Sequence, residues 1–407
     1  MPDQASIIVG LEIGTTKICA VVSTRAEQGA LNIIGLGQCR SRGVRKGEVV
    51  NHEWAAEDLR HAIADAEQMA DVEVRRVFLG VTGSHIRGVN NRGAHPIRSD
   101  DRVISSADVK EVIKIAKAAN LPSQNYNLHS IRQHFQVDDV EGILNPEGMV
   151  GSRLELGMHQ VQGSVNRLQN TVKVVRDLQL EVDDVVFNGL AASLAVLTTQ
   201  QKQDGALVID LGAGTTEYVV YANGVIKHTG VLAVGGEHVT NDLAFGLKVP
   251  LSRAEQLKVA NGAAVAAPGD KGQTIEIPAE VGLAPRTVNL DHLRRIMAVR
   301  IEEVFGIIAE DLQNAGPFPY LRAGVVLCGG GARTPGIVKA AEAVFELPVT
   351  LGANTAIGGL AQTLDQPEFS TALGLAKYGS FQDPKTEARF SLREGLLNTF
   401  GNWFKAR

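Results

Sequence analysis

The stretches Gly10 to Val22 (GLEIGTTKICAVV) and Leu207 to Tyr221 (LVIDLGAGTTEYVVY) decide the fold, because they repeat one pattern in two distant parts of the chain. Each has an apolar run that ends in one acidic residue, then a glycine-rich turn with paired threonines, then a second apolar run. The pattern predicts two strands joined by a loop of the size that holds a phosphate. We therefore expect an internally duplicated protein that clamps one ligand between two such hairpins.

The composition is that of an ordinary globular protein, with 407 residues, 44% of them hydrophobic and 21% charged. This length allows two or more domains, since a domain usually has about 100 to 200 residues. The formal net charge of -5 argues against a general nucleic-acid binder. The three cysteines form no CxxC pair, which favours a reducing cytosol. The chain start lacks the features of a signal peptide, and no apolar run approaches the roughly 20 residues that span a bilayer, so we expect any membrane contact to be peripheral.

The two glycine-rich turns carry the donors that a phosphate needs. Glycine lets the backbone aim several N–H groups at one anion, and threonine hydroxyls add donors and can contact a metal. The preceding acids, Glu12 and Asp210, are expected to hold a hydrated Mg2+, which prefers oxygen ligands and keeps several waters. The alternative for either hairpin alone is an ordinary tight turn. The residues predicted to bind phosphate are Gly14, Thr15, Thr16 and Lys17 in the first turn and Gly212, Ala213, Gly214, Thr215 and Thr216 in the second.

A third glycine cluster, formed by Gly329, Gly330, Gly331 and Ala332, follows the apolar run that starts at Gly324. We expect it to open a helix, whose N-terminus favours anionic groups, and to let a base or ribose approach the backbone. The alternative is close packing between a helix and a strand. With two phosphate turns upstream, nucleoside contact is the interpretation that we prefer.

Three segments, LEIGTTK, IDLGAGTTE and LCGGGARTPGI, resemble in this order the actin, Hsp70 and sugar-kinase superfamily. The small-residue segments Asn188 to Leu197 and Thr371 to Gly379 resemble the connections between its two lobes. Within the superfamily, Asn32 to Asn51, Val186 to Thr198 and Leu251 to Ala264 resemble the FtsA family of bacterial cell-division actins. The resemblance implies an α/β, actin-like ATPase fold of two duplicated lobes with ATP and Mg2+ between them. It also implies an inserted α+β subdomain in the first half and an insertion in the second half.

The expected organisation follows from this resemblance and from the pattern of elements. The first-lobe core is predicted at 1–84, 164–204 and 367–379, its inserted subdomain at 85–163, the second-lobe core at 205–234 and 317–366, the nucleotide-side insertion at 235–316, a linker at 380–389 and a membrane-targeting helix at 390–407. In the inserted subdomain, Ser105 to Asp108 is a capping box that predicts the start of a helix. Cys39 to Asn51 is predicted to be a loop, and one strand is expected near Gln273 to Pro278.

The resemblance implies that the second-half insertion binds the adenosine. The residues that match this role are Gly235, Gly236, Asn241, Glu255 and Lys258. Glu255 has a structural alternative, because Ser252 to Glu255 is itself a capping-box sequence. Lys258 follows three residues later, on the same helical face as Glu255.

The candidate catalytic residues are Asp210 and Glu12. One departure from the family pattern argues against efficient catalysis by them. Related ATPases commonly place Glu or Gln near the first connection to position the attacking water, whereas Phe187 to Leu190 offers only Asn188. We therefore expect slow hydrolysis, with ATP acting chiefly as an assembly ligand. The competing hypothesis is a sugar or acid kinase of the same superfamily, which would need a catalytic carboxylate and polar sugar ligands. An Hsp70-like chaperone is disfavoured because no peptide-binding domain follows Tyr378.

The segment Phe390 to Arg407 (FSLREGLLNTFGNWFKAR) predicts an amphipathic helix after a polar tether. Its apolar face is formed by Leu392, Leu396, Leu397, Phe400, Trp403 and Phe404. Nearby Lys and Arg residues and the tryptophan suit the surface of a membrane. The alternative is a terminal helix packed on the protein's own core. One such helix binds lipid weakly, so many copies must act together, which gives a filament a physical purpose.

The family resemblance also implies the partners. These are the C-terminal tail of the tubulin-like FtsZ, further copies of the chain in a filament, later division proteins and the lipid surface. Arg300, on a helix expected at His292 to Ala315, matches the family's basic position for the FtsZ tail, and a solvated helix charge is its alternative. The implied location is the cytoplasmic face of the bacterial inner membrane at the division site.

Overall fold

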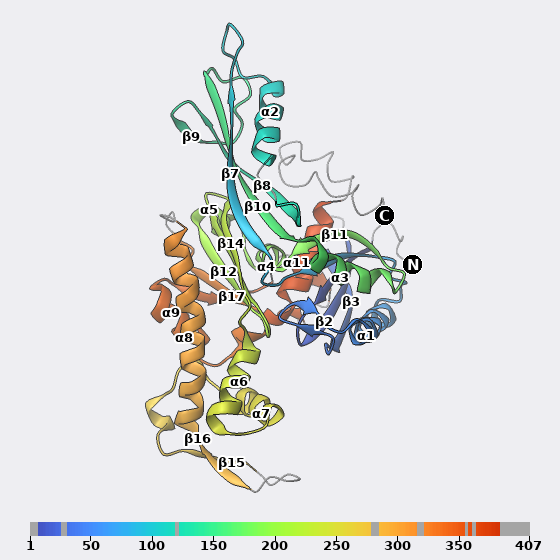
Figure 1. The fold of residues 1–407 in the computed structure, drawn as a ribbon, viewed down its shortest axis with the longest axis vertical. Coiled ribbons are helices and arrows are strands. Elements are labelled where there is room, and N and C mark those ends of the chain that lie inside the picture. Colours follow the sequence, from blue (N-terminus) through green and yellow to red (C-terminus); the bar gives the residue numbers. More distant parts are fainter. Residues whose placement is uncertain are drawn as a thin grey trace.

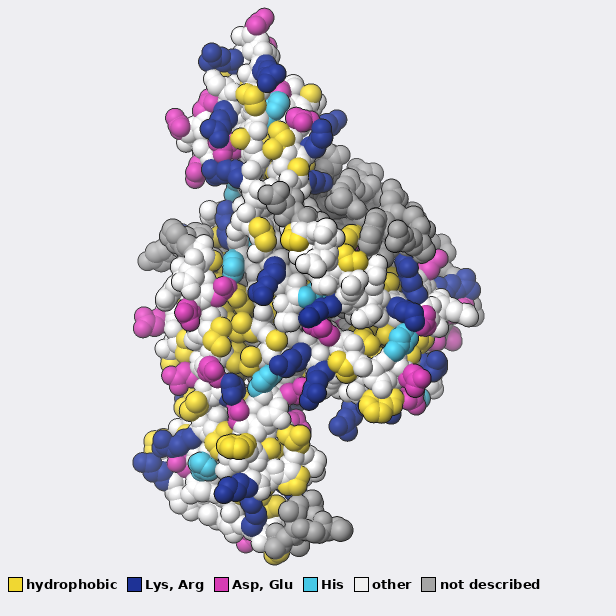
Figure 2. Space-filling model, in the orientation of Figure 1, with side chains coloured by type: hydrophobic (Ala, Val, Ile, Leu, Met, Phe, Trp, Pro, Cys, Tyr) yellow, Lys and Arg dark blue, Asp and Glu magenta, His cyan; other side chains and the backbone are white. Residues whose placement is uncertain are grey.

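The computed structural model describes residues 7–25, 31–118, 122–277, 285–315, 321–354, 357–359 and 364–382. Figure 1 shows an elongated molecule with two lobes side by side in the middle, the inserted subdomain at one end and the second-half insertion at the other. The surface is hollowed between the first lobe and the second-half insertion (Figure 2). The predicted linker and membrane helix at 380–389 and 390–407 lie almost wholly outside the described residues.

Two sheets with one topology form the centres of the lobes. The first has the order β11-β6-β1-β2-β3-β19 and the second the order β14-β13-β12-β17-β18. In both, a central strand pairs antiparallel with the next strand of its hairpin and parallel with a later crossover strand. The strands are β1 (Ile7–Ile13), β2 (Lys17–Arg25), β3 (Leu31–Arg40), β6 (Arg76–Val81), β11 (Glu181–Phe187), β12 (Ala206–Leu211), β13 (Thr216–Ala222), β14 (Val225–Leu232), β17 (Val325–Cys328), β18 (Val349–Leu351) and β19 (Ile357–Gly359). The five-strand orders β11-β6-β1-β2-β3 and β18-β17-β12-β13-β14 match, and β19 is an additional edge strand of the first sheet. This match confirms the duplicated α/β fold.

Helices cover both sheets and fill the space between them. The helix α1 (His52–Ala70) begins at the cap Asn51, whose side chain accepts a hydrogen bond from the Trp54 backbone, and it packs on β3. The helices α4 (Asn188–Val196) and α11 (Ser370–Phe381) lie against each other between the lobes (Figure 1). The remaining core helices are α3 (Val165–Arg176), α5 (Thr199–Asp204) and α9 (Ile337–Phe345). Both predicted connections are therefore central helices.

The inserted subdomain is a four-stranded sheet with one helix on it. Its strand order is β7-β10-β8-β9, and the helix α2 (Ser106–Lys117) packs on β7 and β10. The predicted capping box is present, because the Ser105 and Asp108 side chains each accept a hydrogen bond from the other residue's backbone N–H. The strands are β7 (Arg87–Pro96), β8 (Asn125–Val137), β9 (Val140–Ile143) and β10 (Arg153–Ser164). A separate apolar cluster including Val112, Leu154 and Met158 forms its core.

The second-half insertion has its own small core. The helices α6 (Gly236–Leu247), α7 (Leu251–Asn261) and α8 (Leu290–Asn314) bury Leu243, Leu257 and Leu293 between them. The expected strand near Gln273 is one of a pair, because β15 (Thr274–Ile277) pairs antiparallel with β16 (Arg286–Asn289). The sequence pattern did not predict β16.

Two further expectations need correction. The stretch predicted to be only a loop between Cys39 and Asn51 contains a short hairpin, β4 (Val44–Arg45) and β5 (Glu48–Val49). The third glycine cluster does not open an α-helix; it forms a four-residue 3-10 turn, Gly330–Arg333, and α9 begins after Gly336. Two other 3-10 turns are Pro268–Asp270 and Pro367–Phe369. Within the described part of the chain, no helix is long and apolar enough to cross a membrane.

Candidate functional site

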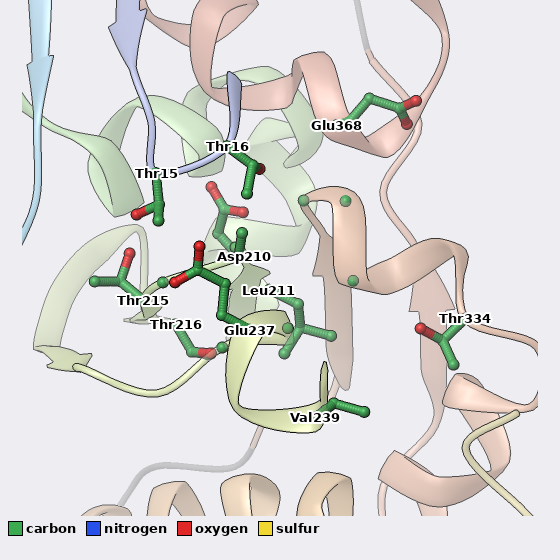
Figure 3. Close-up of a pocket in the computed structure, with 18 of the residues that line it drawn as sticks. Thr15, Thr16, Asp210, Leu211, Thr215, Thr216, Glu237, Val239, Thr334 and Glu368 are labelled. Carbon is green, nitrogen blue, oxygen red and sulfur yellow. The ribbon is translucent and has the colours of Figure 1, made fainter. Parts of the chain in front are cut away.

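A cavity of about 660 Å³ lies between the lobes and is lined by both glycine-rich turns, the third glycine cluster and the second-half insertion (Figure 3). The predicted residues that line it are Glu12, Gly14, Thr15, Thr16, Lys17, Asp210, Gly212, Ala213, Gly214, Thr215, Thr216, Gly235, Gly236, Glu255, Lys258, Arg300, Gly329, Gly330 and Gly331. The fold thus brings together residues from nearly the whole length of the chain.

The two turns have one geometry and lie against each other. A Cβ on Gly14 would lie 2.7 Å from the Lys17 carbonyl oxygen, and a Cβ on Gly212 would lie 2.7 Å from that of Thr215. Each turn therefore needs glycine at the same place. A Cβ on Gly214 would collide with the Thr15 hydroxyl, so the turns of the two lobes are in direct contact. Residues of both turns line the cavity.

The acids before the turns are held by neighbours from other segments. Asp210 is buried and accepts a 2.6 Å hydrogen bond from the Thr371 hydroxyl, and burial raises the pKa of its carboxyl to about 6. The Lys17 ammonium lies 3.5 Å from the Glu12 carboxylate. Burial lowers the pKa of Lys17, but the charges of Glu12, Cys19 and Asp210 together outweigh it, and the pKa is raised. Gly329 has a φ of 81°, and a Cβ there would collide with the Asp210 carboxylate.

Glu217 is a site residue that we did not predict. It faces Asp210 across the β12–β13 hairpin, accepts a hydrogen bond from the Thr82 hydroxyl and lines the cavity near the start of α4. Burial, followed by the charge of Asp210, raises the pKa of its carboxyl to about 8. The available signal was its place directly after the paired threonines, which puts it opposite Asp210 once the hairpin forms. The cleft therefore holds a carboxyl group, mostly protonated at neutral pH, where we expected only Asn188.

Lys258 and Glu255 lie together at the opposite end of the cavity. The Lys258 ammonium is 2.7 Å from the Glu255 carboxylate and donates to the Thr240 hydroxyl at 2.8 Å and to the Gly236 carbonyl at 3.1 Å. The capping-box alternative for Glu255 is wrong, because α7 begins at Leu251 after Pro250 and no side chain caps it. Glu255 is thus free to face the cavity.

Two predicted nucleotide contacts are not brought into the cavity. Asn241 is exposed and does not line it, because the α6 residues that line the cavity are Gly236, Glu237 and Val239, and Asn241 is turned about 200° from Val239. Ala332 is buried in the core of the second lobe. Its neighbour Gly330 has open space where a Cβ would be, so the backbone of the third cluster is accessible from the cavity.

An apolar wall completes the end of the cavity near Lys258. It is formed by Val239, Val259, Met297, Ile301, Val304, Phe305 and Ile337. These side chains come from four helices, so no local sequence pattern joins them. Arg300 also lies on this side, where its guanidinium pairs with Asp242 at 2.6 Å and with Glu303. Its predicted role with a partner stays a prediction.

The cavity contains acceptors that make no hydrogen bond. Asn188 Oδ1 and Glu12 Oε2 are buried without one, although the Lys17 ammonium lies 3.5 Å from Glu12 Oε2, and both residues line the cavity. Buried polar atoms are usually paired, so these atoms fit waters on a cation or a bound polar ligand. No cluster of three or more His, Cys, Asp or Glu among the described side chains is arranged to hold a metal ion directly.

Two sheets of one topology with a cavity between their glycine-rich turns define an actin-like ATPase fold. The family model "Cell division protein FtsA" matches residues 207–374, and the model "SHS2 domain inserted in FTSA" matches residues 83–162. The cell division protein FtsA of Pseudomonas aeruginosa is 38% identical over 376 residues, which cover 92% of this chain and 90% of that protein. The chain belongs to the FtsA family of cell division proteins, and its role is that of an actin-like protein in cell division.

Solved structures agree on the fold. The PilM–PilN type IV pilus biogenesis complex contains a chain with a TM-score of 0.63 and 15% identity, covering 92% of this chain and 98% of that one. MreB5 of Spiroplasma citri bound to ADP has a TM-score of 0.55 and 15% identity, covering 94% and 98%. The predicted domain boundaries and the roles of the individual site residues stay predictions.

Proposed function

We propose that the chain binds ATP with Mg2+ in the cavity between its lobes. The observation that carries this proposal is the direct contact of two matching glycine-rich turns, one from each lobe, beside Glu12 and Asp210. The turns would hold the phosphates through backbone N–H groups, and the apolar wall with Glu255 and Lys258 would hold the adenosine. The description of the MreB5 structure as bound to ADP supports a nucleotide in this fold.

The carboxylates of Glu12 and Asp210 would hold Mg2+ through its waters. When bound, the ion would neutralise phosphate charge at the turns. Thr371 and Lys17 fix the positions of these two acids, and Glu217 lies beside them on the same hairpin as Asp210. We infer that ATP acts chiefly as an assembly ligand, because it contacts both lobes and would hold them in one relative position.

We further propose that the chain forms actin-like filaments that anchor FtsZ to the cytoplasmic face of the membrane at the division site. Membership of the FtsA family supports this, as does the amphipathic sequence Phe390 to Arg407. The second-half insertion would receive the FtsZ tail, and the inserted subdomain would contact neighbouring copies and later division proteins. Each terminal helix binds weakly, so assembly on ATP would turn many weak anchors into firm attachment.

Pelleting with lipid vesicles tests the anchor. Full-length protein with ATP should pellet with anionic vesicles, and protein ending at Ala388 should stay in the supernatant. A full-length variant with Leu396→Gln and Trp403→Gln is the matched control, because it keeps the length and the charge but loses the apolar face. Equal pelleting of all three proteins would exclude the terminal helix as the anchor.

A further inference from the structure

The phosphate end of the cavity carries more negative than positive charge. Glu12, Asp210 and Glu237 line it, together with Glu217, whose raised pKa of about 8 leaves its carboxyl mostly protonated at neutral pH. Figure 3 shows the Glu237 side chain directed toward the region of Thr15 and Asp210. The nearest lining cation, Lys17, is already paired with Glu12, and Lys258 is paired with Glu255. A triphosphate would add several more negative charges, so positive charge near the turns would stabilise it in addition to a bound cation.

The β4–β5 hairpin lies directly over the place where the two turns meet. The Gly47 backbone N–H donates a 3.0 Å hydrogen bond to the Thr15 hydroxyl of the first turn. On the second turn, a Cβ added to Gly214 would lie 2.9 Å from both the N and the Cα of Lys46. The hairpin tip therefore touches one phosphate turn of each lobe.

The turn of the β4–β5 hairpin has a defined conformation, and the strand that follows it is held by hydrogen bonds. Lys46 and Gly47 both have positive φ, 50° and 75°, which makes a tight two-residue turn. At the base, Glu48 accepts a 2.7 Å hydrogen bond from Arg167, which also donates to Ser84. The position of Lys46 relative to the turns is thus set by contacts on both sides.

Lys46 supplies positive charge that no acid neutralises. It is exposed, and no carboxylate of the described residues lies within ion-pair distance of it. Burial raises the pKa of the Glu237 carboxyl, and the positive charges that oppose this rise are, in decreasing order, Arg45, Lys258 and Lys46. Figure 2 shows Lys and Arg side chains gathered over the junction of the first lobe and the second-half insertion.

The contacts along the second glycine-rich turn place Lys46 away from the end of the cavity near Lys258, where the adenosine is proposed to bind. Gly236, which accepts from Lys258, lies beside Ala213 of the second turn, whereas Lys46 lies on the next residue, Gly214. A phosphate chain that starts near Lys258 therefore ends near the hairpin tip.

We propose that Lys46 binds the terminal phosphate of ATP and so makes the cavity prefer ATP over ADP. The inference rests on the proposed nucleotide binding and names the residue that distinguishes the two nucleotides. A phosphate oxygen at the meeting point of the turns would receive a charge-assisted hydrogen bond from the ammonium group. ADP lacks the group that Lys46 would contact.

Titration of the full-length chain with Mg2+ and either ADP or a hydrolysis-resistant ATP analogue tests this. Lys46→Asn keeps a residue that tolerates positive φ but removes the charge. It should weaken binding of the ATP analogue about tenfold and change ADP binding less than about twofold. Lys46→Arg should restore part of the preference.

Lys248→Asn is the matched control. Lys248 is also exposed with a φ of 52°, but it caps the end of α6, whereas the Lys46 backbone touches Gly214 of the second turn; neither lysine lines the cavity itself. This variant should bind both nucleotides like the wild type. Equal weakening of both nucleotides by Lys46→Asn, or no weakening, would overturn the inference while leaving the nucleotide site intact. A wild-type chain that binds neither nucleotide would remove the proposed function, and this inference with it.

Discussion

Asp184 makes the stability of the chain depend on pH through one buried carboxylate. It accepts hydrogen bonds of 2.8 Å from the Tyr378 hydroxyl and from the Val185 backbone, and burial raises its pKa to about 7. The unfolded value is about 3.9, so between these pH values the folded state binds more protons than the unfolded state. The contribution of Asp184 to the free energy of unfolding should therefore fall as pH rises from about 4 to about 7.

The substitution Asp184→Asn should remove this contribution, because the amide keeps the size of the side chain and cannot ionise. At pH 8 the variant should be more stable than the wild type by on the order of 1 to 3 kcal/mol, and at pH 5 the difference should shrink. Urea denaturation at both pH values measures this. Asp204→Asn, at an exposed carboxylate, is the control. A gap between wild type and Asp184→Asn that does not change with pH would contradict the assignment.

Site residues that belong to a local sequence pattern could be predicted, whereas those that reach the site only through the pairing of two strands could not. Glu12 and Asp210 were found because each ends an apolar run directly before a glycine-rich turn. Glu217 enters the site only through its register opposite Asp210. Asn241 was predicted from a motif match, which does not fix the direction of a helical side chain; it lies outside the cavity lining, and its role stays a prediction.

Two mid-helix glycines should respond in opposite ways to one substitution. Gly374 lies in α11, where a Cβ would collide with the carbonyl of Ala191 in α4, whereas Gly306 lies in α8 with open space around the same position. Gly374→Ala should destabilise the chain by about 1 to 3 kcal/mol, because the two central helices must separate. Gly306→Ala should stabilise it by about 0.5 to 1 kcal/mol through better helix propensity.

Thermal or chemical denaturation of the two variants beside the wild type measures the difference. Since the chemical change is identical, each variant is the control for the other. Destabilisation of similar size at both positions would show that the contact between α4 and α11 does not set the cost.

Long elements with a clear period were predicted, whereas very short ones depend on partners far away in the chain. β19 has three residues and pairs with β3, which lies at the other end of the sequence. The same holds for the β4–β5 hairpin, whose tip is held by Thr15 and Gly214. Such elements have too few residues for a hydrophobic period to appear, so their stability comes from tertiary contacts.

The inserted subdomain is joined to both lobes through two buried histidines. His129 on β8 accepts a 3.0 Å hydrogen bond from the Phe187 backbone of the first lobe. His159 on β10 contacts Asn90 at 2.8 Å and Thr229 of the second lobe at 2.9 Å. Since Asn90 offers an oxygen, His159 donates from Nδ1 and accepts at Nε2, which is the neutral form. The subdomain thus bridges the two lobes.

Acid should weaken the complete chain at these two histidines. Burial lowers the pKa of both His129 and His159 to about 3, whereas the unfolded value is about 6.5. Below pH 6.5 the unfolded state therefore binds more protons, so stability present at neutral pH is lost as pH falls toward 3. Each histidine contributes a loss of up to about 1.4 kcal/mol per pH unit.

The loss of stability between pH 7.5 and pH 5.5, measured by urea denaturation, should be smaller in the double variant His129→Gln, His159→Gln than in the wild type. The exposed His61→Gln is the control and should keep the wild-type loss. The comparison uses the change in stability with pH within each variant, so a pH-independent loss of stability caused by the substitutions does not affect it. If the double variant loses as much stability between pH 7.5 and pH 5.5 as the wild type, these histidines are not the acid-sensitive groups.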